Sequence, residues 1–429
     1  MNTDQTTART LRFDGVDHAD GAASDPNVLA WMQGSPPPPD KRIRFSNDRF
    51  LDFPQIRWTL SHMRELVATA NVWRGDGAPS DLGAASPATT EAIDALTFTD
   101  MQGLQRDWAS SLADTYTDGI VVLHQGRRVY ERYLGAGQAH RPHACFSVTK
   151  SYAGTLAATL VHDGVLDEQR LVPHYLPEMA GTAYANATLR QVLDMQIGVD
   201  YSELYADPDA SIWHYARAGN FRARNPGYNG PDTLYEFLLT LRRQGEHGQA
   251  FAYKTVNTEV LCWIMKRVSG LGLADMLSER LWSRIGCEQD AYLTVDALGV
   301  PFGGGGLNAS LRDMARFGEL MRCEGAWQGQ QVVPAAVVAD IQRGADPARF
   351  AKAGYTLLPG YSYRNMWWVS HNALGVVEAR GIHGQRLYIA PAAQVVIARF
   401  ASHPVAASAA NDPITLPAFE ALARMLQGR

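Results

Sequence analysis

The sequence predicts an α/β (α+β) protein in which an antiparallel sheet is flanked by helices and carries an inserted, mainly helical domain. Strand patterns occur at residues 119–133 and again at 366–400, whereas residues 165–300 show mainly helical patterns. Strands at both ends with helices between them indicate one sheet built from both parts of the chain. The 429 residues also exceed what one compact core usually holds. We therefore expect a sheet domain at 41–165 plus 300–429 and a mainly helical domain at 166–299.

Residues 1–40 are rich in Asp, Ala, Gly and Pro and end in four consecutive prolines, Pro36 to Pro39. Such a composition offers little apolar surface to bury, and a proline run is stiff and extended. We therefore expect a disordered tail and a Pro-rich connector before the first domain.

The first regular element is a hairpin. Residues 119–124 and 127–133 are rich in β-formers, and Gln125-Gly126 between them suits a two-residue turn. A long apolar helix follows from Ser147 to His162, and Asp163-Gly164 suits its end.

Later elements follow the same signals. Thr188 suits the cap of a helix through Leu193, and Asn257 or Thr258 suits the cap of a helix that runs to Val268. Strand patterns then occur at 366–370, 376–378, 386–389 and 395–400, and a last helix is expected at 417–426.

The overall composition excludes several classes of protein. Hydrophobic residues make up 46% of the chain and charged residues 19%, as in ordinary globular proteins. A formal net charge of −5 gives no general attraction to nucleic acid. No apolar run approaches 18 residues, so no membrane span is expected. The polar start has no apolar secretory core, and four widely spaced cysteines fit a reducing compartment. We therefore expect a cytoplasmic protein with neither nucleic-acid nor membrane partners.

Ser147-Val148-Thr149-Lys150 is the first sign of chemistry. Positions i and i+3 share a face of a helix, so the Ser147 hydroxyl and the Lys150 amine can meet. A serine hydroxyl is a poor nucleophile unless a base takes its proton, and a desolvated neutral lysine can be that base. The Ser147 amide would also lie at the helix start, where negative charge is favoured. A Ser-x-x-Lys pattern can arise by chance, but its place at the head of an Ala-rich helix favours a catalytic function.

Tyr253 lies just before the next apolar helix, in Phe251-Ala252-Tyr253-Lys254. A tyrosine there could relay a proton between nucleophile, base and leaving group. The chain has seventeen tyrosines, most of which we expect to be packing residues, so Tyr253 gains weight only together with Ser147 and Lys150.

These residues together resemble a known family. The Ser147 motif, Tyr253 and the run 305–318 (GGLNASLRDMARFG) are similar to the serine β-lactamase and penicillin-binding superfamily, in its class C and esterase branch. Four further stretches are similar to the nylon-oligomer hydrolases of the 6-aminohexanoate-dimer type, namely 192–196, 200–201, 367–368 and 382–385. The resemblance covers about residues 115–402 in the correct order. It implies a β-lactamase/DD-peptidase-like fold.

The resemblance also implies roles for single residues. Ser147 would be the nucleophile that forms an acyl-enzyme, Lys150 its base and Tyr253 the proton shuttle. The family's Lys/His-x-Gly motif falls on Ala379-Arg380-Gly381. The amide of the next residue, Ile382, would then bind the oxyanion together with the amide of Ser147.

Four further residues are implied on the substrate side. Tyr205 matches a tyrosine that assists amide cleavage in the nylon-oligomer enzymes, and Trp368 matches a wall of their cleft. Asn257 is the asparagine nearest to the family's Tyr-x-Asn motif, whose third place here is Thr255. His383 either lines the cleft or is a satisfied histidine behind it.

Two departures from the family pattern bear on the substrate. Ala379 replaces a basic residue that helps to bind the carboxylate of β-lactams and peptides, which argues against those substrates. Ala216 falls where some amide-cleaving relatives place an acid that holds the substrate amine. Cleavage of the linear nylon dimer is therefore expected to suffer more than ester hydrolysis.

Other patterns give weaker hypotheses. His140, His143 and Cys145 lie close together but lack a fourth ligand at metal spacing, so we expect no metal. Gly303 to Gly306 lack the Lys-Ser/Thr of a phosphate loop, so a tight loop against the active site is favoured. No Gly-x-Ser-x-Gly surrounds Ser147, which argues against an α/β-hydrolase.

The sequence thus predicts a cofactor-independent serine hydrolase that cleaves amide or ester bonds of small linear substrates. A 6-aminohexanoate-oligomer hydrolase-like amidase with carboxylesterase activity is the leading hypothesis. The alternatives are a plain carboxylesterase and a catalytically silent relative that only binds ligands. The sequence leaves the physiological substrate and the oligomeric state open, a homodimer included.

Overall fold

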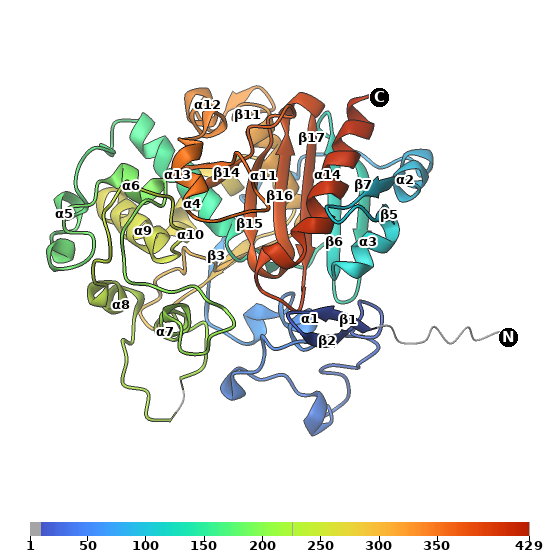
Figure 1. The fold of residues 1–429 in the computed structure, drawn as a ribbon, viewed down its shortest axis with the longest axis horizontal. Coiled ribbons are helices and arrows are strands. Elements are labelled where there is room, and N and C mark those ends of the chain that lie inside the picture. The colour runs from blue at the N-terminus through green and yellow to red at the C-terminus, as the bar shows by residue number, and fades with distance from the viewer. Residues whose placement is uncertain (1–9, 225, 429) are drawn as a thin grey trace.

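The computed structural model describes residues 10–224 and 226–428 and has a seven-stranded antiparallel sheet at its centre (Figure 1). The strand order is β13-β14-β15-β16-β17-β6-β7, so strands from the last third of the chain pair with the early hairpin. This confirms one sheet built from both parts of the chain. The strands are β6 (Thr117–His124), β7 (Arg127–Tyr133), β13 (Ser362–Arg364), β14 (Trp367–Val369), β15 (Val377–Gly381), β16 (Gln385–Ala390) and β17 (Val395–Ala401).

The turn of the β6–β7 hairpin is the predicted Gln125-Gly126. Both residues have positive φ, 53° and 78°. Two left-handed residues in a two-residue turn match the twist of the flanking strands, and glycine adopts this conformation without strain.

Both faces of the sheet are buried. Along β6, Val121 and Leu123 belong to one apolar cluster, whereas Ile120 and Val122 belong to the other. This follows from the alternation of side chains in a strand. Helices α4 and α11 pack on the first face, and α2, α3 and α14 lie by the second. Their bounds are α2 (Pro87–Asp94), α3 (Trp108–Asp114), α4 (Val148–His162), α11 (Leu311–Arg322) and α14 (Asp412–Gln427).

Helix α14 begins five residues before the predicted start at Pro417, with Pro413 in its first turn. Proline is favoured in the first turn of a helix, which is why Pro417 suggested a start; here Pro417 lies inside the helix instead.

The region between the two halves of the sheet is mainly helical, as predicted, but it contributes one strand. Strand β9 pairs with β3 and β10 in a second sheet of order β3-β9-β10-β8. The division into two domains stays a prediction. The strands of this second sheet are β3 (Thr69–Val72), β8 (His143–Ala144), β9 (Ala291–Thr294) and β10 (Leu307–Ala309). The helices of the middle region are α5 (Val172–Tyr175), α6 (Leu189–Leu193), α7 (Ser211–Ala218), α8 (Leu234–Thr240), α9 (Val256–Ser269) and α10 (Leu273–Leu277).

Thr188 caps α6 as predicted, with a reciprocal hydrogen bond between its own amide and Gln191. The remaining elements are short. They are β4 (Thr97–Thr99), β5 (Gln105–Asp107), β11 (Ala326–Trp327), β12 (Gln330–Gln331), α1 (Ile56–Thr59), α12 (Ala335–Arg343) and α13 (Pro347–Ala351).

The N-terminal segment differs from the disordered tail that its composition predicts. Strands β1 (Thr10–Phe13) and β2 (Val16–Ala19) form a hairpin. The Phe13 ring packs edge-on against His403, with ring centroids 4.6 Å apart, and Arg57 donates a hydrogen bond to the Ser24 hydroxyl at 2.9 Å. The order of this segment therefore comes from contacts with distant residues, which composition cannot reveal. Residues 1–9 lie outside the described part of the chain.

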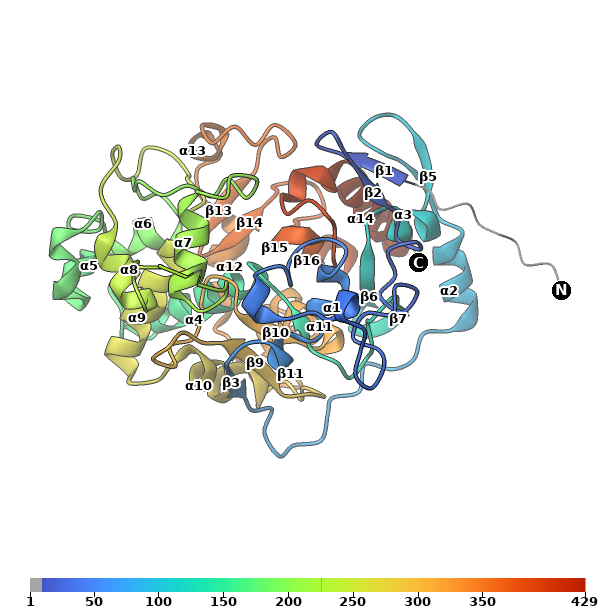
Figure 2. The same ribbon diagram turned by 90° about the horizontal axis from the view of Figure 1, so that it is seen from below.

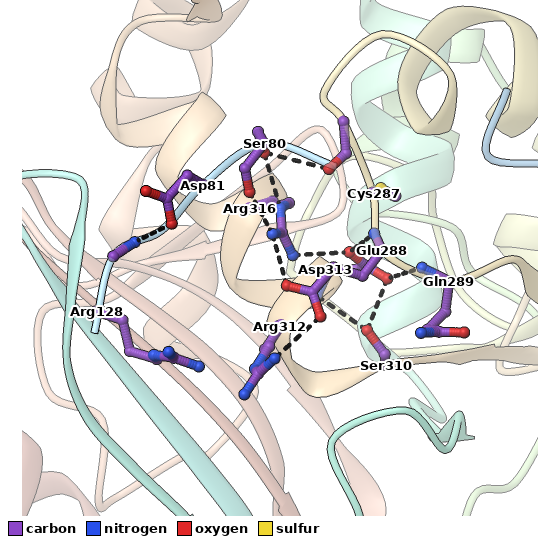
Figure 3. A network of polar contacts seen from close by, with 12 residues as sticks. Ser80, Asp81, Arg128, Cys287, Glu288, Gln289, Ser310, Arg312, Asp313 and Arg316 are labelled. Carbon is purple, nitrogen blue, oxygen red and sulfur yellow. Dashed lines mark hydrogen bonds and ion pairs between the residues drawn. The ribbon is translucent and has the colours of Figure 1, made fainter. Parts of the chain in front are cut away.

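A buried polar network ties three separate segments together (Figure 3). The Arg316 guanidinium on α11 donates to the Ser80 backbone carbonyl at 2.6 Å, to Asp313 at 3.0 Å and to Glu288 at 2.7 Å. Asp313 in turn accepts from the Glu288 backbone amide at 2.7 Å. The guanidinium also donates to the Ser80 hydroxyl at 2.9 Å, so the network holds the loop around Ser80 against α11.

Candidate active site

Ser147 lies at the start of α4, directly after the short strand β8. It is the N-cap residue of the helix, but within the described chain its hydroxyl makes no capping hydrogen bond. Phe146 before it has a positive φ of 45°, which marks a sharp turn from strand to helix. The hydroxyl is therefore free for another partner, and the Ser147 amide lies at the positive end of the helix.

Lys150 supplies that partner one helical turn later. Its Nζ atom lies 2.7 Å from the Ser147 Oγ and also donates to the carbonyl of Gly304. The side chain is fully buried, and burial lowers the pKa of Lys150 to about 8. Because desolvation penalises the charged ammonium, a sizeable neutral fraction exists near neutral pH. A neutral amine in this place can accept the serine proton.

Tyr253 lies on the other side of the lysine. The Lys150 Nζ is 5.1 Å from the centroid of the Tyr253 ring. Burial raises the pKa of Tyr253 well above its usual value, while a hydrogen bond with Ser147 lowers it in part. The phenol is therefore protonated near neutral pH. The structure thus brings Ser147, Lys150 and Tyr253 together, as the sequence predicts.

Strand β15 ends beside the turn that precedes Ser147. A Cβ atom on Gly381 would lie only 2.7 Å from the Cys145 carbonyl oxygen, so glycine is what permits this approach. Ile382 follows and begins the short 3₁₀ helix η6 (Ile382–Gly384). Ile382 and Ser147 both line the same cavities. This placement suits the predicted role of the Ile382 amide, which stays a prediction.

Two cavities meet at Ser147. The larger has a volume of about 770 Å³ and the smaller about 350 Å³. Ser147, Glu203, Tyr205, Ile382 and Ala407 line both of them. Together they form a cleft with the nucleophile between two binding spaces, and both volumes lie in the range of small-molecule sites.

Tyr205 lies in the cleft, as predicted. Its hydroxyl donates to Glu203 Oε2 at 3.1 Å, and the other Glu203 oxygen accepts from the Thr255 amide. Burial raises the pKa of Tyr205 well above its usual value. Glu203 thereby connects Tyr205 to the chain that carries Tyr253. Sequence reasoning missed this carboxylate, because its contact with Thr255 joins residues 52 positions apart.

Trp368 and His383 take opposite sides of the cleft. Trp368 lines the smaller cavity and stacks on Tyr253, with ring centroids 5.5 Å apart. His383 lines the larger cavity, and its Nδ1 lies 2.7 Å from the His403 carbonyl. Burial lowers the pKa of His383 to about 4, so the ring is neutral and Nδ1–H donates. Both interpretations of His383 therefore hold, because its ring lines the cleft and its Nδ1–H also has a hydrogen-bond acceptor.

Asn257 does not reach the cleft, which corrects the expectation that it binds substrate. Helix α9 begins at Val256 with Thr255 as its N-cap, two residues before Asn257 and three before Thr258, the two predicted caps. Asn257 therefore lies in the first turn, fully buried, where its Oδ1 accepts from the Tyr184 hydroxyl at 2.8 Å. Thr255 lines the larger cavity instead.

Glu259 is a part of the site that the sequence did not reveal. Its carboxylate accepts from the amides of Gly304 at 2.6 Å and Gly303 at 3.0 Å, and from the Tyr215 hydroxyl. Gly304 is the residue whose carbonyl accepts from Lys150. Glu259 therefore fixes the loop that positions the lysine. Burial raises the pKa of Glu259 to about 7.

The loop held by Glu259 is the predicted glycine run. A Cβ on Gly304 would lie 2.3 Å from Thr255 and 2.5 Å from the Tyr215 hydroxyl. Gly304 and Gly305 both line the larger cavity. This confirms a tight loop against the active site.

Arg380 and Gly381 of the third motif line the smaller cavity, whereas Ala379 does not. Ala379 is buried in the apolar core, whereas Arg380 lines the smaller cavity. Its guanidinium lies 5.0 Å from the Trp368 ring centroid and pairs with Asp412. The alternation of a strand explains the difference, because neighbouring residues face opposite sides.

Among the described residues, no three His, Cys, Asp or Glu side chains are grouped so that they could hold a metal ion. The described helices include none that combines the length and apolarity needed to cross a bilayer.

Comparison with known proteins agrees with this architecture. Residues 106–416 match the family described as Beta-lactamase. The chain belongs to that family, and it is an enzyme, a hydrolase of the β-lactamase fold.

Individual relatives narrow the class. The chain is 35% identical over 406 residues to a 6-aminohexanoate-dimer hydrolase of Paenarthrobacter ureafaciens, covering 94% of each protein. A solved structure from Bacillus anthracis, provisionally described as a 6-aminohexanoate-dimer hydrolase, has a TM-score of 0.81 at 30% identity and covers 90% of this chain and 97% of its own. A family VIII carboxylesterase shares the fold, with a TM-score of 0.54 at 16% identity over 80% of this chain and 98% of its own. The predicted family and fold are therefore confirmed.

Proposed function

We propose that this enzyme hydrolyses amide and ester bonds of small linear substrates through an acyl-enzyme on Ser147, as a 6-aminohexanoate-oligomer hydrolase-like amidase with carboxylesterase activity. The observation that carries the proposal is the buried Lys150 amine, 2.7 Å from the Ser147 Oγ and with a pKa lowered to about 8. A base of this kind converts a serine hydroxyl into a nucleophile near neutral pH.

The acylation step follows from the positions of the groups. Ser147 Oγ attacks the substrate carbonyl carbon while Lys150 Nζ accepts the hydroxyl proton. The carbonyl oxygen becomes an anion, which the amides of Ser147 and Ile382 would stabilise. The carbon–nitrogen or carbon–oxygen bond then breaks, and the proton passes by way of Tyr253 to the leaving amine or alcohol.

Deacylation uses the same groups in the reverse direction. Water attacks the acyl carbon, its proton goes to Lys150 or Tyr253, and the Ser147 oxygen regains a proton as the acid leaves. The chain's own residues supply every proton transfer in these steps, and we propose no cofactor. We propose a cytoplasmic place of action on small molecules, with neither nucleic acid nor membrane as partner.

Tyr205 supports the amidase part of the proposal. An amide nitrogen needs a proton before it can leave, and Tyr205 carries a protonated hydroxyl in the cleft beside Glu203. The alternative is a plain carboxylesterase. Comparing the hydrolysis of 4-nitrophenyl acetate with that of the 6-aminohexanoate dimer separates the two, because only the amidase cleaves the dimer at a useful rate.

The nucleophile is tested by labelling. A fluorophosphonate probe should add one covalent group to the intact protein, with Ser147 identified by peptide mass spectrometry. The Ser147→Ala variant should remain unlabelled and should lose ester hydrolysis. Labelling of a different serine, or none in a protein that still hydrolyses esters, contradicts the acyl-enzyme on Ser147. An inert, correctly folded protein supports the silent ligand-binding alternative.

A further inference from the structure

The two cavities at Ser147 have different chemical neighbours. Tyr253 lines the smaller cavity but is absent from the described lining of the larger one. In the proposed reaction, Tyr253 passes a proton to the leaving group, so the leaving group lies on its side. The acyl half of the substrate then extends from Ser147 into the larger cavity. This orientation rests on the proposed function.

The inner part of the larger cavity is apolar. Phe146, Ile212, Phe221 and Phe302 line it, and each is at least nine-tenths buried. Phe221 stacks on Phe302 with ring centroids 5.3 Å apart. Such a surface binds hydrocarbon well, and each methylene transferred from water favours binding by about fourfold.

The outer part of the same cavity is formed by the N-terminal hairpin. Phe13, Asp14, Val16 and His18 line it, although they stand more than a hundred residues before Ser147, and Phe13 and Val16 supply its apolar surface. Figure 1 shows β1 and β2 at the same end of the molecule as α7, which carries Ile212, and Figure 2 views this end directly.

The hairpin is firmly attached at this place. The Ala19 carbonyl accepts from the Tyr116 hydroxyl at 2.9 Å, and the His18 ring packs edge-on against Phe53, with centroids 5.4 Å apart. Phe13 packs against His403. The His403 amide donates to the His383 carbonyl at 3.0 Å, which links this contact to the residue beside Ile382. The hairpin wall is thus connected to the chain that lines the nucleophile.

We infer that the hairpin of residues 10–19 is part of the acyl-binding site, and that its Phe13 and Val16 form the outer wall of a pocket for linear, apolar acyl chains. The aromatic inner surface receives the carbons nearest the carbonyl, and the hairpin contacts the carbons beyond them. A short acyl group such as acetyl stays near Ser147 and does not reach the hairpin. The hairpin therefore makes the enzyme selective for the length of the acyl chain.

The test uses 4-nitrophenyl esters of acetate, butanoate, hexanoate and octanoate, whose leaving group is constant. For the unaltered protein, kcat/KM should rise at least tenfold from acetate to hexanoate. The Val16→Asp variant should lose about tenfold on hexanoate and octanoate, because it replaces an apolar side chain of the wall by a second carboxylate beside Asp14. Its kcat/KM for acetate should stay within about twofold of the unaltered protein.

Val28→Asp is the matched control. Val28 belongs to the same N-terminal segment and is 71% exposed, against 55% for Val16, but it lines neither cavity. The control should keep the whole chain-length profile. Phe13→Ala supplies a second variant, which removes wall surface without adding charge and should flatten the gain between hexanoate and octanoate.

Two results overturn the inference. One is a flat chain-length profile in the unaltered protein. The other is a Val16→Asp variant that slows acetate and hexanoate equally, or neither, while fluorophosphonate labels Ser147 normally. Failure of the proposed function looks different, since labelling and hydrolysis of every ester would then be absent in the unaltered protein as well.

Discussion

Two buried cations in this molecule have opposite surroundings. Arg316 is 1% exposed and its guanidinium meets the carboxylates of Asp313 and Glu288 within 3.0 Å (Figure 3). Lys150 is equally buried, but its hydrogen-bond partners among the described residues are the neutral Ser147 hydroxyl and the Gly304 carbonyl. A buried charge is retained where opposite charges pair with it, and the proton is given up where they do not.

The difference assigns the two residues to different tasks. Arg316 keeps its charge and holds loops together, whereas Lys150 carries a lowered pKa and is free to accept a proton. Exchanging either residue for an apolar one should therefore affect stability and activity in opposite ways, and this contrast can be measured.

The largest effect is expected for activity in Lys150→Met. Removing the base should lower kcat/KM for 4-nitrophenyl esters by about 10⁴-fold or more. The melting temperature should fall little or rise, because a buried amine that makes no direct ion pair is replaced by an apolar side chain of similar volume. Ester kinetics and thermal denaturation of the same sample measure both. A strong loss of stability in Lys150→Met would show that the lysine acts as a structural cation.

The opposite result is expected for Arg316→Met. It leaves the buried Asp313 carboxylate without its cationic partner and the Ser80 carbonyl without its donor, which should destabilise the protein by about 3–5 kcal/mol. Denaturant unfolding measures the change. Since Arg316 lies outside both cavities at Ser147, kcat/KM per folded molecule should stay within about threefold when active sites are counted with a fluorophosphonate. An equal loss of active-site chemistry would contradict the separation of the two regions.

The sequence predicted the local contacts of the active site but not its long-range contacts. Ser147 and Lys150 are one helical turn apart, so their meeting follows from local geometry, and β-rich runs at both ends of the chain predicted the sheet. The contacts that complete the site are long-range. Lys150 and Gly304 are 154 positions apart, and no spacing rule relates Glu259 to that carbonyl.

Two predictions from the sequence, for Asn257 and for the N-terminal segment, differ from the structure for physical reasons. Asn257 was expected at a helix cap, but the helix begins two residues earlier and turns the side chain into the interior. The N-terminal hairpin was hidden by an Asp- and Ala-rich composition, because a few aromatic contacts, such as that of Phe13 with His403, are enough to order it. The local sequence pattern reveals neither the exact residue at which a helix begins nor a small number of contacts with distant residues.

Glu259 lies between the two extremes, since it is a buried carboxylate that acts on Lys150 through Gly304. Glu259→Gln should lower the maximal kcat/KM by about tenfold to a hundredfold, because an amide cannot accept from all three donors. The ionised Glu259 raises the pKa of Lys150, so its loss should also move the acidic limb of the pH profile to lower pH.

Glu319→Gln is the control for Glu259. Glu319 is also buried, at 5% exposure, but it pairs with Arg322 on α11 and lines neither cavity. It should change stability without moving the pH profile. A Glu259 variant that is merely less stable, with an unchanged acidic limb, would reduce Glu259 to a structural residue.

The pH dependence of the unaltered enzyme tests the same lysine without any substitution. Lys150 must be neutral to accept the serine proton, and its pKa is lowered to about 8. The rate of fluorophosphonate labelling should therefore rise about tenfold per pH unit below this value and level off above it. Glu259, with a pKa raised to about 7, should add steepness at the acidic side because its protonation removes an acceptor for the glycine loop. Labelling rates from pH 5.5 to 9.5 measure the profile, and a rate that is constant across this range would mean that a group other than Lys150 takes the proton.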